Sequence, residues 1–368
     1  MRTHTIIAIG LATLGTWTPV SGEPEPEKES PTIRLRELPR ITLPPYEEPP
    51  PANRIIDKLI DSLANMDAPY YGLSPTLSGN AFAPLDGMED ATMFLLADHQ
   101  IKQPEAFRKL VSLGPAALPR LLKSLDDDRP TKITIRHEFI SGAMVFGQET
   151  DENPLNPIEQ RALGGWRRGD PFHSKNTTHA YTVKVGDVCF VAIGQIVSRW
   201  YSAVRYQPTA CIVVNSPVRD RKLARVIRRI WSGPDPRKKL FNSLLTDYAT
   251  EGIYKGGGLD EWDAGSEFQT GAATRLLYYF PKSSAKLIAD RLNKLDVTRV
   301  GPPSAERASD EELRAWMARE VRNGVRTCDF IRAVAWSREP EIVAALDSIR
   351  KRTTDTDIID AISPPEDE

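Results

Sequence analysis

PEAFRKLVSLGPAALPRLLKSL, residues 104–125, is the stretch of sequence from which the fold class follows. Residues 104–113 have the apolar spacing of a helix, Gly114-Pro115 ends it, and residues 116–125 predict a second helix. Glycine after one helix and proline in the first turn of the next are typical of a tight helical hairpin. Each helix has an apolar face that the pair alone cannot fully bury, so such hairpins tend to stack.

The hairpin resembles a HEAT repeat through its pattern of Leu110, Val111, Leu113, Gly114, Ala117, Leu118, Pro119, Leu121, Leu122, Leu125 and Asp127. Two weaker relatives of the pattern follow, at residues 271–295 with a break at Pro281 and at residues 328–351 with a break at 337–340. Their spacing is irregular. The resemblance implies a mostly α fold, an irregular α-solenoid of HEAT-like hairpins over residues 53–368.

A second resemblance involves residues 185–197 with residues 205–209 and 215–217. These stretches are similar to a segment of exported bacterial proteins that have no assigned function. The resemblance agrees with export and implies no mechanism.

The first residues predict export. Arg2 precedes a short apolar run over residues 6–17, and Val20-Ser21-Gly22 supplies small residues for a signal peptidase. We therefore expect a signal peptide at residues 1–22 and a periplasmic or secreted protein. The alternative is an uncleaved anchor, which the shortness of the run disfavours because a span needs about 20 residues. Residues 23–52 are rich in Pro and Glu and predict a disordered linker.

Composition narrows the function classes. Lys plus Arg (48) nearly balances Asp plus Glu (50), whereas a nucleic-acid binder normally has a basic excess. After the signal peptide, no stretch is apolar enough to predict a transmembrane segment. The three cysteines, Cys189, Cys211 and Cys328, allow at most one bridge, and their apolar neighbours favour buried thiols.

Residues 131–182 interrupt the helical pattern. Residues 132–136 alternate like a strand, and a polar stretch containing Gly and Pro follows, so we expect an irregular, partly β insertion. Such segments are often functional, but a flexible insertion has the same pattern. An enzyme, possibly a metal-dependent hydrolase, is the alternative function here, with His137, Glu138, Asp170, His173 and His179 as its candidates.

The usual residues of several chemistries are missing. The position four after His137 is Ser141, where a zinc-hydrolase helix needs a second His. The chain has no Gly-x-Ser-x-Gly elbow and no phosphate loop ending in Gly-Lys-Ser or Gly-Lys-Thr. We therefore expect no catalytic residue, no metal site and no cofactor.

A helix from about residue 219 to Trp231 is the candidate binding element. Apolar residues fall on one side of it, and the opposite side has five cations: Arg221, Lys222, Arg225, Arg228 and Arg229. Such a surface suits an acidic protein, an anionic polymer or a membrane headgroup. The alternative is a solvated face that acids elsewhere in the fold neutralise.

These patterns together predict an exported, non-catalytic helical-repeat scaffold that binds a protein or polymer partner in the cell envelope. Large surfaces with little chemistry are what helical solenoids usually offer.

Overall fold

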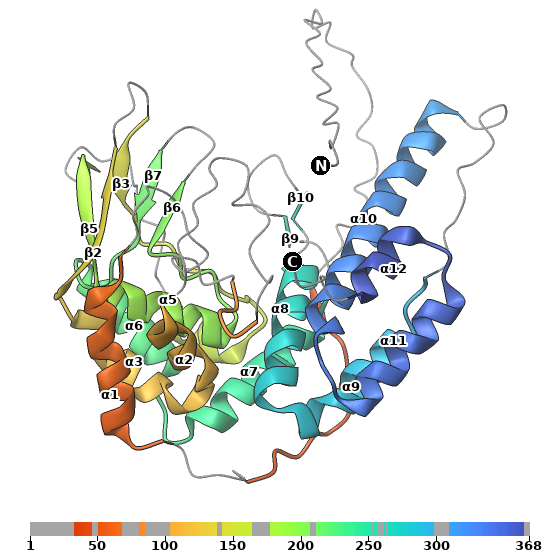
Figure 1. The fold of residues 1–368 in the computed structure, drawn as a ribbon. Coiled ribbons are helices and arrows are strands. Elements are labelled where there is room, and N and C mark those ends of the chain that lie inside the picture. The colour runs from red at the N-terminus through yellow and green to blue at the C-terminus, as the bar shows by residue number, and fades with distance from the viewer. Residues whose placement is uncertain are drawn as a thin grey trace, which may run out of the picture.

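In the computed structural model, the described residues are 33–45, 51–67, 81–85, 104–137, 142–163, 177–206, 211–251, 254–255, 261–262, 264–297 and 309–363. They form a mostly helical fold with short strands, as the sequence predicts (Figure 1). The helices are α1 (Asn53–Ser62), α2 (Glu105–Ser112), α3 (Leu118–Lys123), α4 (Pro157–Leu163), α5 (Val185–Val197), α6 (Arg221–Trp231), α7 (Pro236–Ala249), α8 (Ala264–Tyr279), α9 (Pro281–Leu292), α10 (Asp310–Ala335), α11 (Pro340–Arg352) and α12 (Thr356–Ile362).

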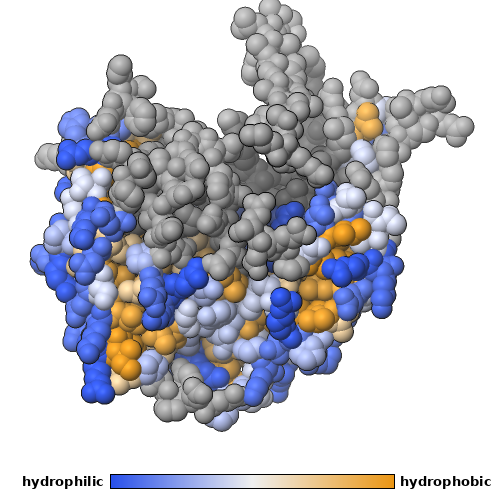
Figure 2. Space-filling model, in the orientation of Figure 1, coloured by the Kyte–Doolittle hydropathy of each residue, from blue (hydrophilic) through white to orange (hydrophobic). Residues whose placement is uncertain are grey.

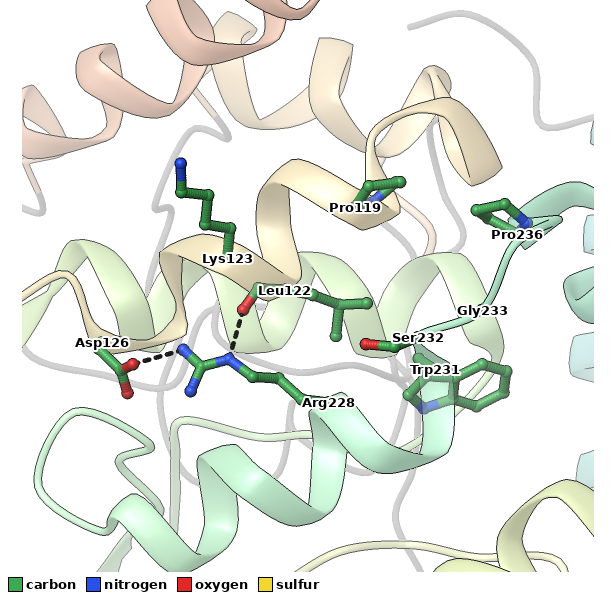
Figure 3. Close-up of a pocket in the computed structure, with 9 residues that line it drawn as sticks. All are labelled: Pro119, Leu122, Lys123, Asp126, Arg228, Trp231, Ser232, Gly233 and Pro236. Atoms are coloured by element: carbon green, nitrogen blue, oxygen red, sulfur yellow. Dashed lines mark hydrogen bonds and ion pairs between the residues drawn. The ribbon is translucent and has the colours of Figure 1, made fainter.

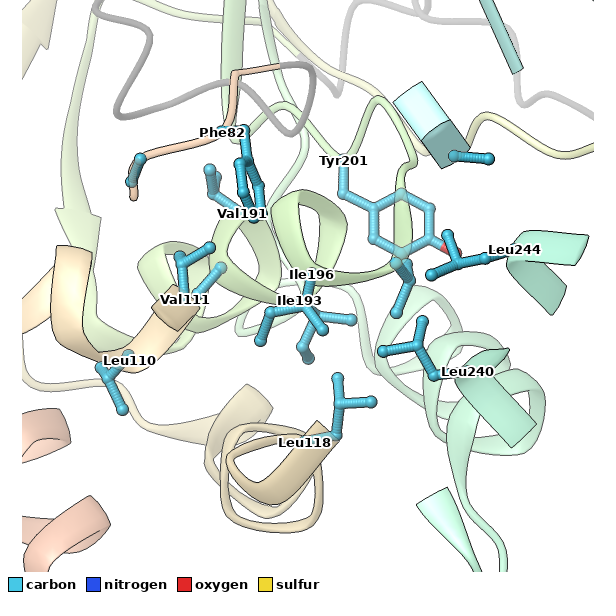
Figure 4. Close-up of a cluster of buried hydrophobic side chains, with 14 of the residues drawn as sticks. Phe82, Leu110, Val111, Leu118, Val191, Ile193, Ile196, Tyr201, Leu240 and Leu244 are labelled. Atoms are coloured by element: carbon cyan, nitrogen blue, oxygen red, sulfur yellow. The ribbon is translucent and has the colours of Figure 1, made fainter. Parts of the chain in front are cut away.

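Helix α5 is the centre of the core. All 13 of its residues are buried, which fits a helix that is apolar on every side. It contacts α1, α2, α3 and α7, and Figure 4 shows Val191, Ile193 and Ile196 of α5 among apolar side chains from these neighbours. The helix ends at Ser198, which has a left-handed φ of 61°.

The hairpin at residues 104–125 forms as predicted from α2, a 3₁₀ turn at Gly114–Ala116 and α3. Gly114 has φ +53°, and a Cβ built on it would lie 2.4 Å from the ring of Tyr279. The Tyr279 hydroxyl donates a hydrogen bond to the Val111 carbonyl at 2.6 Å. The turn therefore requires glycine, both for its backbone and for the close approach of α8.

The two later helical pairs also form, and they pack on each other. Helices α8 and α9 meet at Phe280-Pro281, while α10 and α11 are separated by residues 336–339. Helix α8 packs against α10 and α9 packs against α11 (Figure 1, right). One detail differs from expectation, because α10 begins at Asp310, well before the start of the helical pair predicted at residues 328–351. Gly324 alone does not break it, since one glycine costs only about 1 kcal/mol in a helix.

The strands are short and form several small sheets. They are β1 (Arg34–Leu35), β2 (Pro130–Arg136), β3 (Met144–Phe146), β4 (Thr177–Thr178), β5 (Ala180–Lys184), β6 (Val204–Tyr206), β7 (Ile212–Val214), β8 (Thr250–Glu251), β9 (Tyr254–Lys255) and β10 (Glu261–Trp262). Strands β2 and β5 pair antiparallel, and a four-stranded sheet has the order β4-β3-β7-β6. Strand β3 lies parallel to β7, so strands beyond residue 182 complete the sheet that the insertion begins.

Residues 33–45, which we call the strap, lie within the segment predicted to be a disordered linker. In this part the chain is folded onto the body: β1 pairs with β8, and the Arg36 amide donates to the Ala249 carbonyl at 2.8 Å. Leu38, Ile41 and Leu43 are half-buried against the core. Apolar residues lie between the prolines of the strap, and their burial against the body is favourable.

The predicted signal peptide lies outside the described residues. Within the described ranges, no helix combines the length and the apolar character needed to cross a membrane.

Candidate binding surface

Helix α6 presents the predicted cations on a firmly anchored element. Asp220 caps its first turn by accepting hydrogen bonds from the amides of Lys222 and Leu223, at 2.8 and 3.3 Å. Its inner side is buried and consists of Leu223, Ala224, Val226, Ile227, Ile230 and Trp231. The Trp231 indole donates to the Tyr201 hydroxyl at 3.0 Å, so the end of the helix is also fixed. The predicted amphipathic helix is confirmed.

The outer side of α6, here called the basic face, consists of Arg221, Lys222, Arg225, Arg228 and Arg229. All are exposed except Arg228, which is half-buried. In the part of the chain that the structure describes, no carboxylate forms an ion pair with Arg221, Lys222 or Arg225. These cations are exposed, as the sequence predicted. That they bind a partner remains a prediction.

Arg228 differs from these three cations because it forms an ion pair within the protein. Its Nη2 lies 2.6 Å from a carboxylate oxygen of Asp126, and its Nε donates to the Leu122 carbonyl at 2.9 Å. These contacts neutralise the charge and attach α6 to the end of α3. The alternative suggested by the sequence, an acid elsewhere in the fold, applies to Arg228.

A pocket of about 470 Å³ lies between α3 and the end of α6, next to Arg228 (Figure 3). Its lining consists of Pro119, Leu122, Lys123, Asp126, Arg228, Trp231, Ser232, Gly233 and Pro236. At its edge, Lys239 donates to the Ser232 carbonyl at 2.6 Å, and partial burial lowers the pKa of this lysine. The volume is within the range of small ligand sites. Sequence reasoning missed the pocket because its walls are about 100 residues apart, as the Leu122–Arg228 contact shows (106 residues).

Large apolar side chains are scattered singly over the rest of the described surface. On the face drawn in Figure 2, small hydrophobic areas are bordered by hydrophilic side chains. The exposed large hydrophobic residues are Leu35, Ile55, Trp200 and Val343, and they belong to different elements.

The residues of the alternative enzyme site are only partly described. The His137 amide donates to the His179 carbonyl at 2.9 Å, so β2 and β5 bring these two main chains together. Glu138, Asp170 and His173 lie outside the described residues. Among the residues that are described, no group of three or more His, Cys, Asp or Glu could hold a metal ion.

A buried ionic network that sequence reasoning missed lies where α4, the end of α5 and α7 meet. Arg199 is fully buried and forms ion pairs with Glu159 and with Asp247, the latter at 2.7 Å. Asp247 also accepts hydrogen bonds from the amide side chains of Asn153 and Asn156, at 3.0 and 3.2 Å. No local pattern reveals such a network, because its members come from residues 153 to 247.

One guanidinium cannot neutralise two buried carboxylates. Burial raises the pKa of Glu159 to about 8, despite the opposing attraction of Arg199. At neutral pH, this shift favours the protonated form of Glu159.

A second buried carboxylate begins α5. Asp187 accepts hydrogen bonds from the Tyr181 and Ser216 hydroxyls, both at 2.6 Å. Burial raises its pKa to about 6. The cluster joins β5, α5 and the chain just before α6, so it helps to position α6. Ser216 and Asp187 are both buried, so the cluster is not accessible to a substrate.

The cysteines agree with the expectation of buried thiols. Cys189, Cys211 and Cys328 are buried and no disulfide joins them. Burial raises the pKa of Cys189 far above its usual value, so this thiol is unreactive.

The fold and this surface together define a mostly helical protein with small sheets and a basic helix on its exterior. Comparison of the chain with protein-family models, curated proteins and solved structures gives no match.

Proposed function

We propose that this protein is an exported, non-catalytic scaffold of HEAT-like helical hairpins that binds a protein or anionic polymer through the basic face of α6. The observation that carries the proposal is the exposure of Arg221, Lys222 and Arg225 on one helix, without a carboxylate partner among the described residues. Cations on packed surfaces are commonly balanced by nearby acids, as Arg228 is here by Asp126.

The anchoring of α6 supports a binding role. Its inner side is buried and its first turn is capped, so the backbone that carries the three cations is already ordered before any partner arrives. Residues four apart on a helix are neighbours on its surface, which places Arg221 beside Arg225. A preordered array loses less entropy on binding than a flexible one, so more of the electrostatic attraction contributes to affinity.

The packing of the later helices supports the scaffold part of the proposal. Pair α8–α9 packs against pair α10–α11. The first helices of the two pairs contact each other, and so do the second helices, as in neighbouring units of helical-repeat proteins. The first hairpin joins them through the Tyr279 contact to Val111. Repeat proteins of this kind usually act by offering surface.

A crosslinking pull-down from the envelope fraction tests the proposal. The test variant is Arg221→Gln, Lys222→Gln and Arg225→Gln together, which removes the unpaired charges and leaves the Arg228–Asp126 link intact. The matched control is Lys294→Gln, Arg350→Gln and Lys351→Gln, which removes three exposed cations near α9 and α11. We expect one discrete partner to be captured by the wild type and the control, and lost from the test variant.

Binding should also weaken with salt, because exposed charges are screened over about 8 Å at physiological ionic strength. Equal capture by the test variant and the wild type would contradict the role assigned to the basic face.

A further inference from the structure

We infer that the partner is a polypeptide: an acidic peptide segment lies along α6 and places one apolar side chain in the pocket between α3 and α6. This inference rests on the proposed function and specifies the chemistry of its partner.

The geometry of α6 leads from the basic face to the pocket. Arg221, Arg225 and Arg228 are spaced by four and three residues, so they form one line along the helix. With a rise of about 1.5 Å per residue, the line is roughly 10 Å long. It ends at the pocket, which Arg228 itself lines, and Figure 3 shows Leu122 on the opposite wall. A ligand lying on the line therefore reaches the pocket with one end.

Charge changes along this line. Arg221 and Arg225 have no carboxylate partner among the described residues, whereas Arg228 is paired with Asp126. An acidic group is attracted to the first two cations, but beside Asp126 it would meet a carboxylate. The end of the ligand at the pocket is therefore best uncharged.

The pocket lining favours an apolar group. Pro119, Leu122, Trp231 and Pro236 provide much of its wall. Two wall carbonyls already accept hydrogen bonds, that of Leu122 from Arg228 and that of Ser232 from Lys239. The remaining acceptors in the lining are Ser232 and Asp126, and Asp126 is already paired with Arg228, whereas a leucine or phenylalanine side chain needs no acceptor. A peptide can supply both features, acidic residues and an apolar side chain at a fixed spacing.

Labelled synthetic probes test this on the full mature chain. The first peptide has four glutamates followed by a leucine, the second has serine in place of the leucine, and the third probe is an oligogalacturonate of equal charge. Fluorescence anisotropy measures each affinity. We expect the leucine peptide to bind about tenfold more tightly than the serine peptide, because burying part of a leucine side chain is favourable.

Gly233→Leu locates the apolar contact. Gly233 lines the pocket, and a Cβ at this position meets only Lys239, at an ordinary 3.5 Å, so a larger side chain can be added at the pocket wall without a backbone clash. We expect Gly233→Leu to lower the affinity for the leucine peptide to that for the serine peptide. The control Gly233→Ala should preserve the difference. Unchanged binding of the serine peptide to Gly233→Leu shows that the variant is folded.

The outcomes separate this inference from the proposed function. Equal binding of both peptides, reduced in the Arg221, Lys222 and Arg225 variant, would overturn the pocket and leave the basic face standing. Tighter binding of the oligogalacturonate than of either peptide would overturn the polypeptide partner. No binding of any probe would overturn the inference, whereas the proposed function is judged separately by the pull-down.

Discussion

Arg199 and the two carboxylates around it show how a single residue ties distant segments together. The guanidinium contacts Glu159 in the insertion and Asp247 in α7, and all three are buried. Removing Arg199 would leave buried carboxyl groups without their cation, so this residue is far less replaceable than a member of a surface ion pair. The cluster fixes the insertion to the helical body.

The proton on Glu159 makes stability depend on pH. In the unfolded chain this carboxyl ionises near pH 4.5, and in the folded protein its pKa is about 8. The folded state therefore binds more protons between these values, and stability falls as pH rises. Asp187, with a folded pKa of about 6, adds a similar decline at lower pH.

We therefore expect the melting temperature of the wild type to fall between pH 6.5 and 8.5. This range lies above the pKa of Asp187 and includes the pKa of Glu159. Glu159→Gln keeps an uncharged side chain of similar size and should flatten the curve in this window. Melting curves followed by circular dichroism measure both. A slope that is identical in the two proteins would show that Glu159 is not the group responsible.

At the level of elements, the tight turn between α2 and α3 depends on Gly114. Its φ of +53° disfavours any side chain, and a Cβ would overlap the Tyr279 ring. We expect Gly114→Ala to lower the free energy of unfolding by about 2 kcal/mol, because the left-handed conformation alone costs roughly 1–2 kcal/mol. Urea denaturation measures the change. Gly233→Ala, where the same methyl meets no obstacle, should change stability little, and a loss as large as that of Gly114→Ala would argue against this explanation.

The sequence predicted elements well where the signal is local. The hairpin at residues 104–125 and the break at Pro281 both depend on residues a few positions apart, and both are found. The amphipathic pattern of α6 was predicted for the same reason. What could not be predicted depends on distant partners: the pairing of β3 with β7, the attachment of Arg228 to Asp126, and the pocket beside it.

For the molecule as a whole, the strap links the start of the described chain to its middle. Besides the β1–β8 pairing, Arg36 lies over the Tyr248 ring at 5.1 Å, and Arg237 donates to the Pro44 carbonyl. Composition predicted an unstructured linker here because proline and glutamate dominate. In this part of the chain, the burial of Leu38, Ile41 and Leu43 stabilises an ordered conformation despite that composition.

Replacing these three residues by serine should lower the free energy of unfolding by about 2–4 kcal/mol, since each is only half-buried and full burial of one such side chain contributes roughly 1.5–3 kcal/mol. Hydrogen exchange should increase at the amide of Arg36, which donates to Ala249. Leu35→Ser is the control, because Leu35 is 48% exposed. Unchanged exchange at Arg36 in the triple variant would mean that the β1–β8 pairing alone holds the strap.

The strap also bears on the order in which the chain acquires its structure during synthesis. The guanidinium of Arg36 contacts Glu251, 215 positions further on. A ribosome releases the strap long before it has made the residues that receive it. The strap therefore cannot take its final position until residue 251 has been made, and until then it remains accessible to chaperones and proteases.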